Sequence, residues 1–252
     1  MCYDVRARTY DAVKYVNRYG RQFIDPTSPW FKLQHWHALA YDHPYIPVIT
    51  SVNPNYIDFL QWGLIPSWVK DPKQVVKIQN STINARGEEL EDKPSFKDVF
   101  RSGQRCLVIL DAFYEHHHKA GNTFPYYIGL KNKEPISVAG LWSYWDSVPG
   151  HERATFTIIT TSGNELLSQI HNNPKLKGPR MPVIIPKDDE MQWLDNKIKL
   201  EDAVELLKPF TSEQLEAYPV RKLRGKNAVG NNQLAIKPYQ YAELTSEQGS
   251  LF

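Results

Sequence analysis

The chain has 252 residues and a formal net charge of +2, and its sequence pI is about 8.3. This mild positive charge does not by itself require a nucleic acid partner. A content of 41% hydrophobic and 23% charged residues is typical of a globular protein. Two cysteines exclude a disulfide framework and favour a reducing, cytoplasmic compartment. No apolar run nears the roughly 20 residues that span a bilayer, and no signal peptide is recognisable, so we expect no membrane partner.

The first part of the chain contains two helical patterns and two strand-like runs. Residues 10–19 are expected to form a short helix, and residues 47–51 and 57–65 to form strands. Residues 94–103 also predict a helix, because a proline stands early, apolar side chains share one face and a glycine ends the segment.

Strand-like runs dominate the middle of the chain. They are rich in β-branched and aromatic residues and are separated by polar or Gly/Pro turns. The runs cover residues 106–114, 125–130, 136–142 and 154–161. The remaining pattern predicts a short strand over 181–186 and helices over 164–170, 188–194 and 201–209.

This order predicts an α+β fold: a single compact domain around a mainly antiparallel, barrel-like β-sheet with peripheral helices. Strands and helices do not alternate regularly, which argues against a doubly wound parallel sheet. We expect the domain to span residues 1–240. From about residue 225 the chain is polar and weakly periodic, which predicts a tail, and residues 241–252 are expected to be flexible.

Cys2 is the first candidate for chemistry, because it stands directly behind the initiator methionine. Removal of Met1 would leave an amine with a pKa near 7.7–8.0 beside a thiol with a pKa near 8.5. Such an aminothiol captures an aldehyde: the amine forms a Schiff base, and the thiol closes onto the imine carbon to give a thiazolidine. The same group suits N-terminal-nucleophile amide chemistry. A cysteine without a role remains an alternative.

Glu115 and His171 are candidates for proton transfer. Glu115 ends the apolar run "LVILDAFYE", where burial would raise its pKa and suit it to acid or base work. The alternative is a solvated charge at a strand end. His171 follows an amphipathic helix and precedes a basic loop, and a lone histidine is most often structural. It gains a catalytic interpretation only if it faces Cys2.

Asn84 and Arg86 point the same way if their segment is extended. Asn can orient a carbonyl or an amine, and Arg can bind a phosphate through its planar fork. The alternative is a loop with a surface arginine. Three consecutive histidines at 116–118 cannot easily bind one ion, because neighbours on a strand face opposite ways, so we expect no metal and no other cofactor.

An ordered set of motifs resembles the SOS-response-associated peptidase (SRAP) family of abasic-site processing proteins. The set runs from "MC" at the start through "WGLIPSW", "INARGEEL", "KPSF", "RCLVILDAFYE", "PYYI", "AGLW" and "FTIITT" to "IH" and "RMPVII", ending near residue 186. The resemblance implies a protein that recognises abasic sites in single-stranded DNA and forms a thiazolidine with the ring-opened sugar, which protects the lesion.

The resemblance also implies roles for individual residues. The nucleophile would be Cys2, the orienting amide Asn84, and the proton-transfer groups Glu115 and His171. Arg86 and Arg180 fall where the family contacts DNA phosphates, and Trp68 and Thr160 fall in segments that line the DNA channel. The peptidase label reflects removal of the initiator methionine, which is thought to be self-catalysed.

The sequence departs from the family pattern near the reactive end and after His171. Positions 3 and 4, usually Gly and Arg, are Tyr3 and Asp4, which removes a phosphate contact, and His116 replaces a frequent Trp. The usual Asn-x-Ala-Pro segment corresponds to "HALAY", with His37 and Ala40. Residues 172–179 are an insertion, and Lys175 and Lys177 keep it basic, so it could add a DNA contact.

The chain ends "QGSLF", which resembles the short peptide that binds the bacterial sliding clamp. Gln248, Leu251 and Phe252 would carry that contact, and an incidental apolar end is the alternative. The functional hypotheses are therefore covalent capture of abasic single-stranded DNA, a cysteine peptidase that uses Cys2 and His171 on peptides, and a DNA-binding module with an inert Cys2. We expect a monomer in each case.

Overall fold

The computed structural model describes residues 2–8, 12–32 and 34–245. The strands in this part are β1 (Asp4–Arg8), β2 (Gln22–Phe23), β3 (Gln34–Leu39), β4 (Tyr45–Thr50), β5 (Asn53–Trp62), β6 (Asn84–Arg86), β7 (Arg105–Leu110), β8 (Ala112–Lys119), β9 (Asn122–Leu130), β10 (Ile136–Trp145), β11 (Arg153–Ser162), β12 (Arg180–Pro182) and β13 (Leu215–Pro219). The α-helices are α1 (Ala12–Tyr19), α2 (Pro72–Ser81), α3 (Lys97–Arg101), α4 (Glu165–Ile170), α5 (Glu190–Leu194), α6 (Leu200–Glu205) and α7 (Ala242–Thr245).

The larger sheet closes partly on itself. Its strand order is β12-β11-β10-β7-β4-β5-β2, and β11 also pairs with β5 in parallel, so β11, β10, β7, β4 and β5 form a ring. β6 adds in parallel to β11, opposite residues 158–160. The pairings within the ring are otherwise antiparallel. The expected α+β domain with a mainly antiparallel, barrel-like sheet is therefore confirmed.

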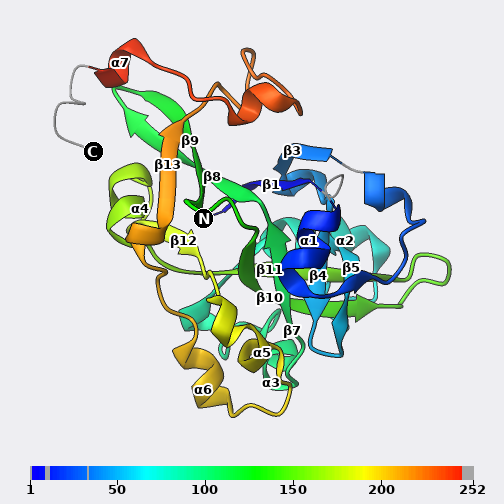
Figure 1. The fold of residues 1–252 in the computed structure, drawn as a ribbon. Helices are drawn as coiled ribbons and strands as arrows, with labels where there is room; N and C mark the ends of the chain where they lie inside the picture. The colour runs from blue at the N-terminus through cyan, green and yellow to red at the C-terminus, as the bar shows by residue number, and fades with distance from the viewer. Residues whose placement is uncertain (1, 9–11, 33, 246–252) are drawn as a thin grey trace.

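The smaller sheet places the N-terminal strand in its interior. Its order is β13-β9-β8-β1-β3, so β1 forms antiparallel ladders on both sides, with Asp4 opposite Leu39 of β3 and Tyr114 of β8. Figure 1 shows β1 flanked by these strands, with α7 at one end of the molecule and α3, α5 and α6 at the other. The start of the chain is thereby fixed by hydrogen bonds where chain ends usually fray.

β7 is buried on both faces, which explains why its sequence is apolar without a break after Arg105. Val108 and Leu110 pack with the smaller sheet in one core, whereas Leu107 and Ile109 pack under α1, α3 and α5 in a second. Trp193 of α5 donates its indole N–H to the carbonyl of Cys106 at 2.9 Å. Successive side chains of β7 point to opposite faces of the sheet, so this one strand contributes to two hydrophobic cores.

The run 106–114, expected as one strand, is two strands in different sheets. Asp111 separates them, and its carboxylate accepts the backbone N–H of Arg8 at 2.9 Å and pairs with Lys14 at 3.3 Å. A buried carboxylate needs such partners, and they lie where the chain crosses from the larger sheet to the smaller one. The periodicity could not reveal the break, because both strands are buried.

Part of the polar stretch after residue 225, expected as a tail, packs onto the smaller sheet. Ala235 is buried beside Tyr114 and Tyr127, and Tyr241 and Leu244 are buried against Phe124. The tail expectation was therefore wrong for residues 225–245, because isolated apolar residues anchor a segment that lacks periodicity.

The clamp-binding residues Gln248, Leu251 and Phe252 lie outside the described residues, and their role stays a prediction. Deletion of residues 248–252 should abolish binding to a sliding clamp in a pull-down experiment. None of the described helices is both long and apolar enough to cross a membrane.

Gly140 offers a test of the ring packing. A Cβ at this position would lie 2.7 Å from the carbonyl oxygen of Thr157 and 2.8 Å from Cys106 Sγ. We expect Gly140→Ala to lower the free energy of unfolding by about 1–3 kcal/mol, because overpacking forces backbone shifts. Gly87→Ala is the matched control: its Cβ would meet its nearest neighbours at 3.5 Å, so denaturant unfolding should change by less than about 0.5 kcal/mol. An unchanged midpoint for Gly140→Ala would contradict this packing.

Candidate active site

The backbone of the first described residues is held from two sides. Asn84 Nδ2 donates to the carbonyl of Cys2 at 2.8 Å, and the N–H of Ala40 donates to the carbonyl of Tyr3 at 2.8 Å. β6 brings Asn84 here because it pairs with β11 opposite Ile158. Asn84 Oδ1 is buried and accepts no hydrogen bond from the described residues. The Asn84 amide therefore fixes the start of the chain through Nδ2, and its Oδ1 can still accept a hydrogen bond.

Glu115 lies next to this end of the chain. The β1–β8 ladder ends where Asp4 pairs with Tyr114, and Tyr3 and Glu115 are the residues directly beyond that end. The side chain of Glu115 is buried. Burial raises the pKa of Glu115 to about 7, and the negative charge of Asp4 adds to the rise. Near neutral pH this carboxyl can therefore both give and accept a proton.

His171 follows the last residue of α4 and faces Glu115. Its Nδ1 lies 3.0 Å from the backbone nitrogen and 2.9 Å from the carbonyl oxygen of Arg180, which fixes the ring, and its Nε2 lies 3.8 Å from Glu115 Oε2. Burial lowers the pKa of His171 to about 4. An ion pair would lower the pKa of the carboxyl and raise that of the imidazole. Both pKa values shift in the opposite direction here. Between about pH 4 and pH 7 they are a neutral pair.

The Cys2 thiol is fully buried beside these groups. Its Sγ lies 3.9 Å from the carbonyl oxygen of Asp4, to which it donates. Burial raises the pKa of the thiol well above its usual value, and the charge of Glu115 raises it further. Cys2, Asn84, Glu115 and His171 are thus brought together from four different segments.

A cavity of about 490 Å³ opens beside this cluster. It is lined by Tyr3, Asp4, Glu115, His116, His118, Thr123, His171, Asn173, Lys175, Leu176 and Arg224. Cys2 is buried and is not part of this lining. The wall thus combines the two proton-transfer candidates with two cationic side chains, Lys175 and Arg224, and the hydroxyl groups of Tyr3 and Thr123.

The residues expected at the DNA channel differ in exposure. The side chain of Arg86 is half-exposed and pairs with Glu89 at 3.2 Å, and Trp68 is exposed. Thr160 is fully buried. Its Oγ1 accepts a hydrogen bond from Arg180 Nη2 at 3.2 Å, so Thr160 orients that arginine and offers no open surface.

Arg180 is already engaged by a carboxylate. Its Nη1 and Nη2 donate to Glu88 at 2.7 and 2.9 Å, and these hydrogen bonds hold the pKa of Glu88 below its usual value. More than half of the Glu88 side chain is exposed. The guanidinium is therefore held in one orientation by a partner that an incoming phosphate could replace.

The insertion at 172–179 is fastened to β8. Asn172 Oδ1 accepts the N–H of His118 at 2.7 Å, and its Nδ2 donates to the carbonyl of the same residue at 2.9 Å. This double contact brings Lys175 to the cavity wall, whereas Lys177 is not part of the lining. His116 and His118 line the cavity, and His117 contacts the carbonyl of Gln169 instead. Among the described residues, no three His, Cys, Asp or Glu side chains are placed to hold a metal ion.

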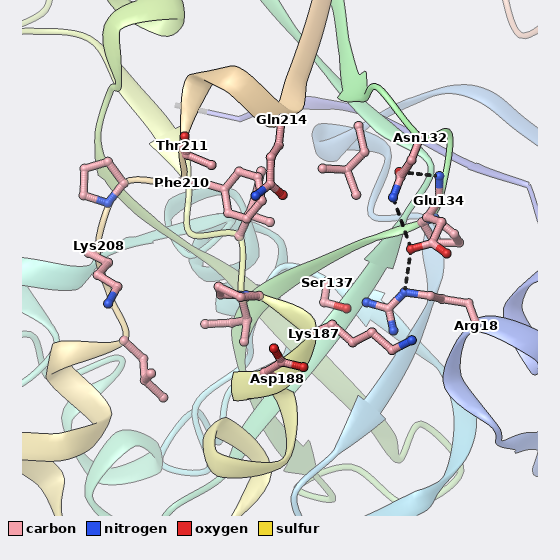
Figure 2. Close-up of a pocket in the computed structure, with 17 residues that line it drawn as sticks. Arg18, Asn132, Glu134, Ser137, Lys187, Asp188, Lys208, Phe210, Thr211 and Gln214 are labelled. Carbon is pink, nitrogen blue, oxygen red and sulfur yellow. Dashed lines mark hydrogen bonds and ion pairs between the residues drawn. The ribbon is translucent and has the colours of Figure 1, made fainter.

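A second cavity, of about 510 Å³, lies between the β9–β10 turn and residues 184–188 and 206–214 (Figure 2). Arg18 reaches into it but is engaged by two carboxylates: Nη2 is 2.6 Å from Glu190 and Nε is 3.6 Å from Glu134. None of the four clustered residues lines this cavity. Glu115 and His171 line the smaller cavity instead, so the candidate site lies there.

The family of the chain follows from comparison with known proteins. The model of the SOS response associated peptidase (SRAP) family matches residues 25–227. The chain belongs to this family. The assignment made from the sequence motifs is confirmed, and the match covers Asn84, Glu115 and His171 but not Cys2.

Several named relatives support the assignment. The abasic site processing protein YoqW of Bacillus subtilis is 38% identical over 71% of this chain and 75% of its own length. YoaM of the same organism is 36% identical over 79% and 84%. The chicken protein HMCES is 32% identical over 64% of this chain and 51% of its own length.

Solved structures show the same fold. A crystal structure from Bacteroides thetaiotaomicron superposes with a TM-score of 0.84 at 32% identity, covering 95% of this chain and 100% of that one. A protein from Bordetella bronchiseptica shares the fold with a TM-score of 0.73 at 22% identity, over 87% and 99%.

The Asp4 carboxylate offers a test of the site electrostatics. Because its negative charge contributes to the raised pKa of Glu115, we expect Asp4→Asn to lower that pKa, measured by NMR titration of the carboxyl carbon.

The pH dependence of the free energy of unfolding tests independently whether folding raises the pKa of Glu115. A carboxyl whose pKa is raised by folding stabilises the native state at low pH, and that contribution is lost as the pH rises from about 4.3 to about 7. Glu115→Gln should remove this loss from thermal unfolding curves. A Glu115 titration near its ordinary value would contradict the assignment.

Proposed function

We propose that this protein captures abasic sites in single-stranded DNA by forming a thiazolidine with Cys2 once Met1 has been removed. The observation that carries the proposal is the convergence of Cys2, Asn84, Glu115 and His171 in one cluster, of which Glu115 and His171 line a cavity. Relatives at 36–38% identity are named abasic site processing proteins. We therefore assign DNA as partner and a monomer as the acting form, because all four residues come from one chain.

The chemistry begins at nitrogen. The free amine of Cys2 attacks the C1′ aldehyde of the opened deoxyribose, and the carbinolamine that forms loses water when an acid protonates its hydroxyl group. The thiol then adds to the imine carbon: a C–S bond forms, and the thiol proton goes to nitrogen. The balance is aldehyde plus aminothiol giving thiazolidine plus one water. A thiol whose pKa is raised suits this order, because it reacts second.

Glu115 and His171 divide the proton transfers. Glu115, with a pKa of about 7, protonates the leaving hydroxyl and takes its proton back from solvent. His171 stays neutral, because its pKa is about 4, and can accept a proton during opening of the sugar ring. Reversal of the crosslink uses the same groups in the opposite direction. The Asn84 amide holds the backbone of the nucleophile throughout.

The surroundings of the cavity fit a single strand. Tyr3 at the wall stacks on Tyr41 with ring centroids 5.5 Å apart, and Tyr41 is exposed, so a base has an aromatic face to stack on. Arg86 and Arg180 supply guanidinium groups for phosphates, in exchange for Glu89 and Glu88. A protein acting on such DNA would associate with the nucleoid in the cytoplasm.

Removal of Met1 is the hydrolytic part of the proposal. Glu115 acts on Cys2 electrostatically and His171 lies beside Glu115, so an acid and a base are close to the residue whose nitrogen would be released. This supports self-catalysed cleavage and accounts for a peptidase label without a peptide substrate. Mass spectrometry of the purified protein should show a chain that begins at Cys2. A retained methionine in active protein would contradict the mechanism.

A denaturing gel tests the crosslink directly. Incubation with single-stranded DNA that carries an abasic site should give a heat-stable adduct, and Cys2→Ala should abolish it, leaving at most a slow, reversible Schiff base. Cys106→Ala is the matched control, because that thiol is also buried but lies in the ring sheet. An adduct with undamaged DNA, none with damaged DNA, or Cys2-dependent cleavage of a peptide panel would each overturn the proposal.

The pH profile of adduct formation tests the acid. The rate should rise as the amine loses its proton and fall again above about pH 7, where Glu115 loses its own. Glu115→Gln should form adduct more slowly and remove the alkaline fall, so that the rate increases steadily up to pH 8.5. A mutant that keeps the falling limb would assign it to another group.

A further inference from the structure

The wall of the smaller cavity also carries an arginine that no sequence motif singles out. Arg224 belongs to the segment after β13, and its neighbour Leu223 is buried in the cluster that contains Tyr114 and Tyr127. Val229 donates its N–H to the carbonyl of Lys222 at 2.9 Å, which closes this segment into a turn. The backbone that carries Arg224 is therefore anchored, although its sequence is polar.

The guanidinium of Arg224 is fixed by a buried carboxylate. Its Nε donates to Asp4 Oδ1 at 2.9 Å, and its Nη2 bonds to Asp4 Oδ2. Asp4 is 1% exposed, and Oδ1 also lies 2.7 Å from His37 Nε2. Burial alone would raise the pKa of Asp4, but the contact with His37 and the charge of Arg224 outweigh it, so the pKa lies below its usual value. Asp4 is thus an anion whose position determines that of the arginine.

Only one edge of this guanidinium is used. The Asp4 contact occupies Nε and one side of Nη2, and no contact among the described residues is assigned to Nη1. The side chain is 40% exposed and lines the cavity. An arginine whose orientation is already fixed loses little freedom when it binds a planar or tetrahedral anion.

Lys175 reaches the same cavity from the inserted loop. The Asn172 contact with β8 fixes the base of that loop, so the ammonium group is delivered to the wall that Arg224 shares. Glu115 and His171 line the cavity as a neutral pair near pH 6 and do not compete for an anion. The two cations therefore border the space next to the reactive groups.

We propose that Arg224, oriented by Asp4, and Lys175 form a subsite for the phosphate that flanks the abasic sugar. The inference rests on the proposed function, because it assigns the substrate's backbone to this wall. A phosphodiester offers two unesterified oxygens, which match one guanidinium edge and one ammonium. Asp4 acts as a positioning residue: it aims the arginine rather than touching the DNA. A peptide carboxylate could occupy the same subsite, and the test distinguishes it from a DNA phosphate.

The test measures binding without the covalent step. Single-stranded DNA carrying a tetrahydrofuran abasic analogue has no aldehyde, so fluorescence anisotropy reports affinity alone. We expect Arg224→Gln to raise Kd about ten-fold, the cost of one charge-assisted hydrogen bond, and to reduce the slope of log Kd against log salt by about 0.7, the contribution of one phosphate on a single strand.

Two matched controls come from the same segments. Arg221 lies three residues earlier, with its guanidinium 4.5 Å from the ring centroid of Tyr239, and it does not line the cavity. Arg221→Gln should leave Kd within about two-fold, well below the ten-fold effect of one charge-assisted hydrogen bond. Lys175→Gln should weaken binding, whereas Lys177→Gln should not. Equal effects within either pair would show general attraction by surface charge and overturn the subsite.

The double variant Asp4→Asn/Arg224→Gln guards against misfolding. It removes the buried carboxylate together with its partner, and it should show the same loss of affinity with a normal thermal unfolding transition. Wild-type protein that crosslinks true abasic DNA while both variants bind the analogue normally would refute the subsite and leave the proposed function standing. No crosslink by the wild type would refute the proposed function itself. The inference would also be overturned if Arg224→Gln lost binding to a peptide with a free carboxylate while its binding to DNA was unchanged.

Discussion

The arrangement of the site depends on the capture of the first residues by hydrogen bonds on both sides. β1 is an interior strand between β3 and β8, and the carbonyls before it are held by the Asn84 side chain and the Ala40 backbone. A chain end that would otherwise fray is thereby held by hydrogen bonds on both sides. A nucleophile on such an end needs no further device to meet a partner on the neighbouring strand.

Burial then sets the protonation states. Taking Glu115 and His171 out of water penalises their charged forms more than their mutual attraction favours them, so both groups become neutral at a separation of 3.8 Å. Asp4 remains charged in the same neighbourhood because His37 and Arg224 supply compensating contacts. Two buried carboxyl groups on adjoining strands thus take opposite states, and the difference lies in their partners.

Much of this could be predicted from the sequence, and the exceptions have physical causes. The antiparallel barrel-like fold followed from strand runs that recur with turns between them. Reactive side chains outside periodic faces singled out Cys2, Asn84, Glu115 and His171, which the structure brings together. The break at Asp111 was missed because both flanking strands are buried and read as one apolar run. Arg224 left no signal, because its cavity position depends on a contact with Asp4 across 220 positions of the chain. Buried Thr160 likewise acts through Arg180, which residue type alone does not reveal.

The complete burial of the Cys2 sulfur bears on how long the protein survives in a damaged cell. Peroxides attack thiolates that water can reach, and this sulfur is neither ionised readily nor exposed. A nucleophile that stays sheltered until an imine has formed next to it avoids conversion to sulfenic or sulfinic acid. The same oxidants that strip bases from DNA would therefore leave this cysteine in its reduced form.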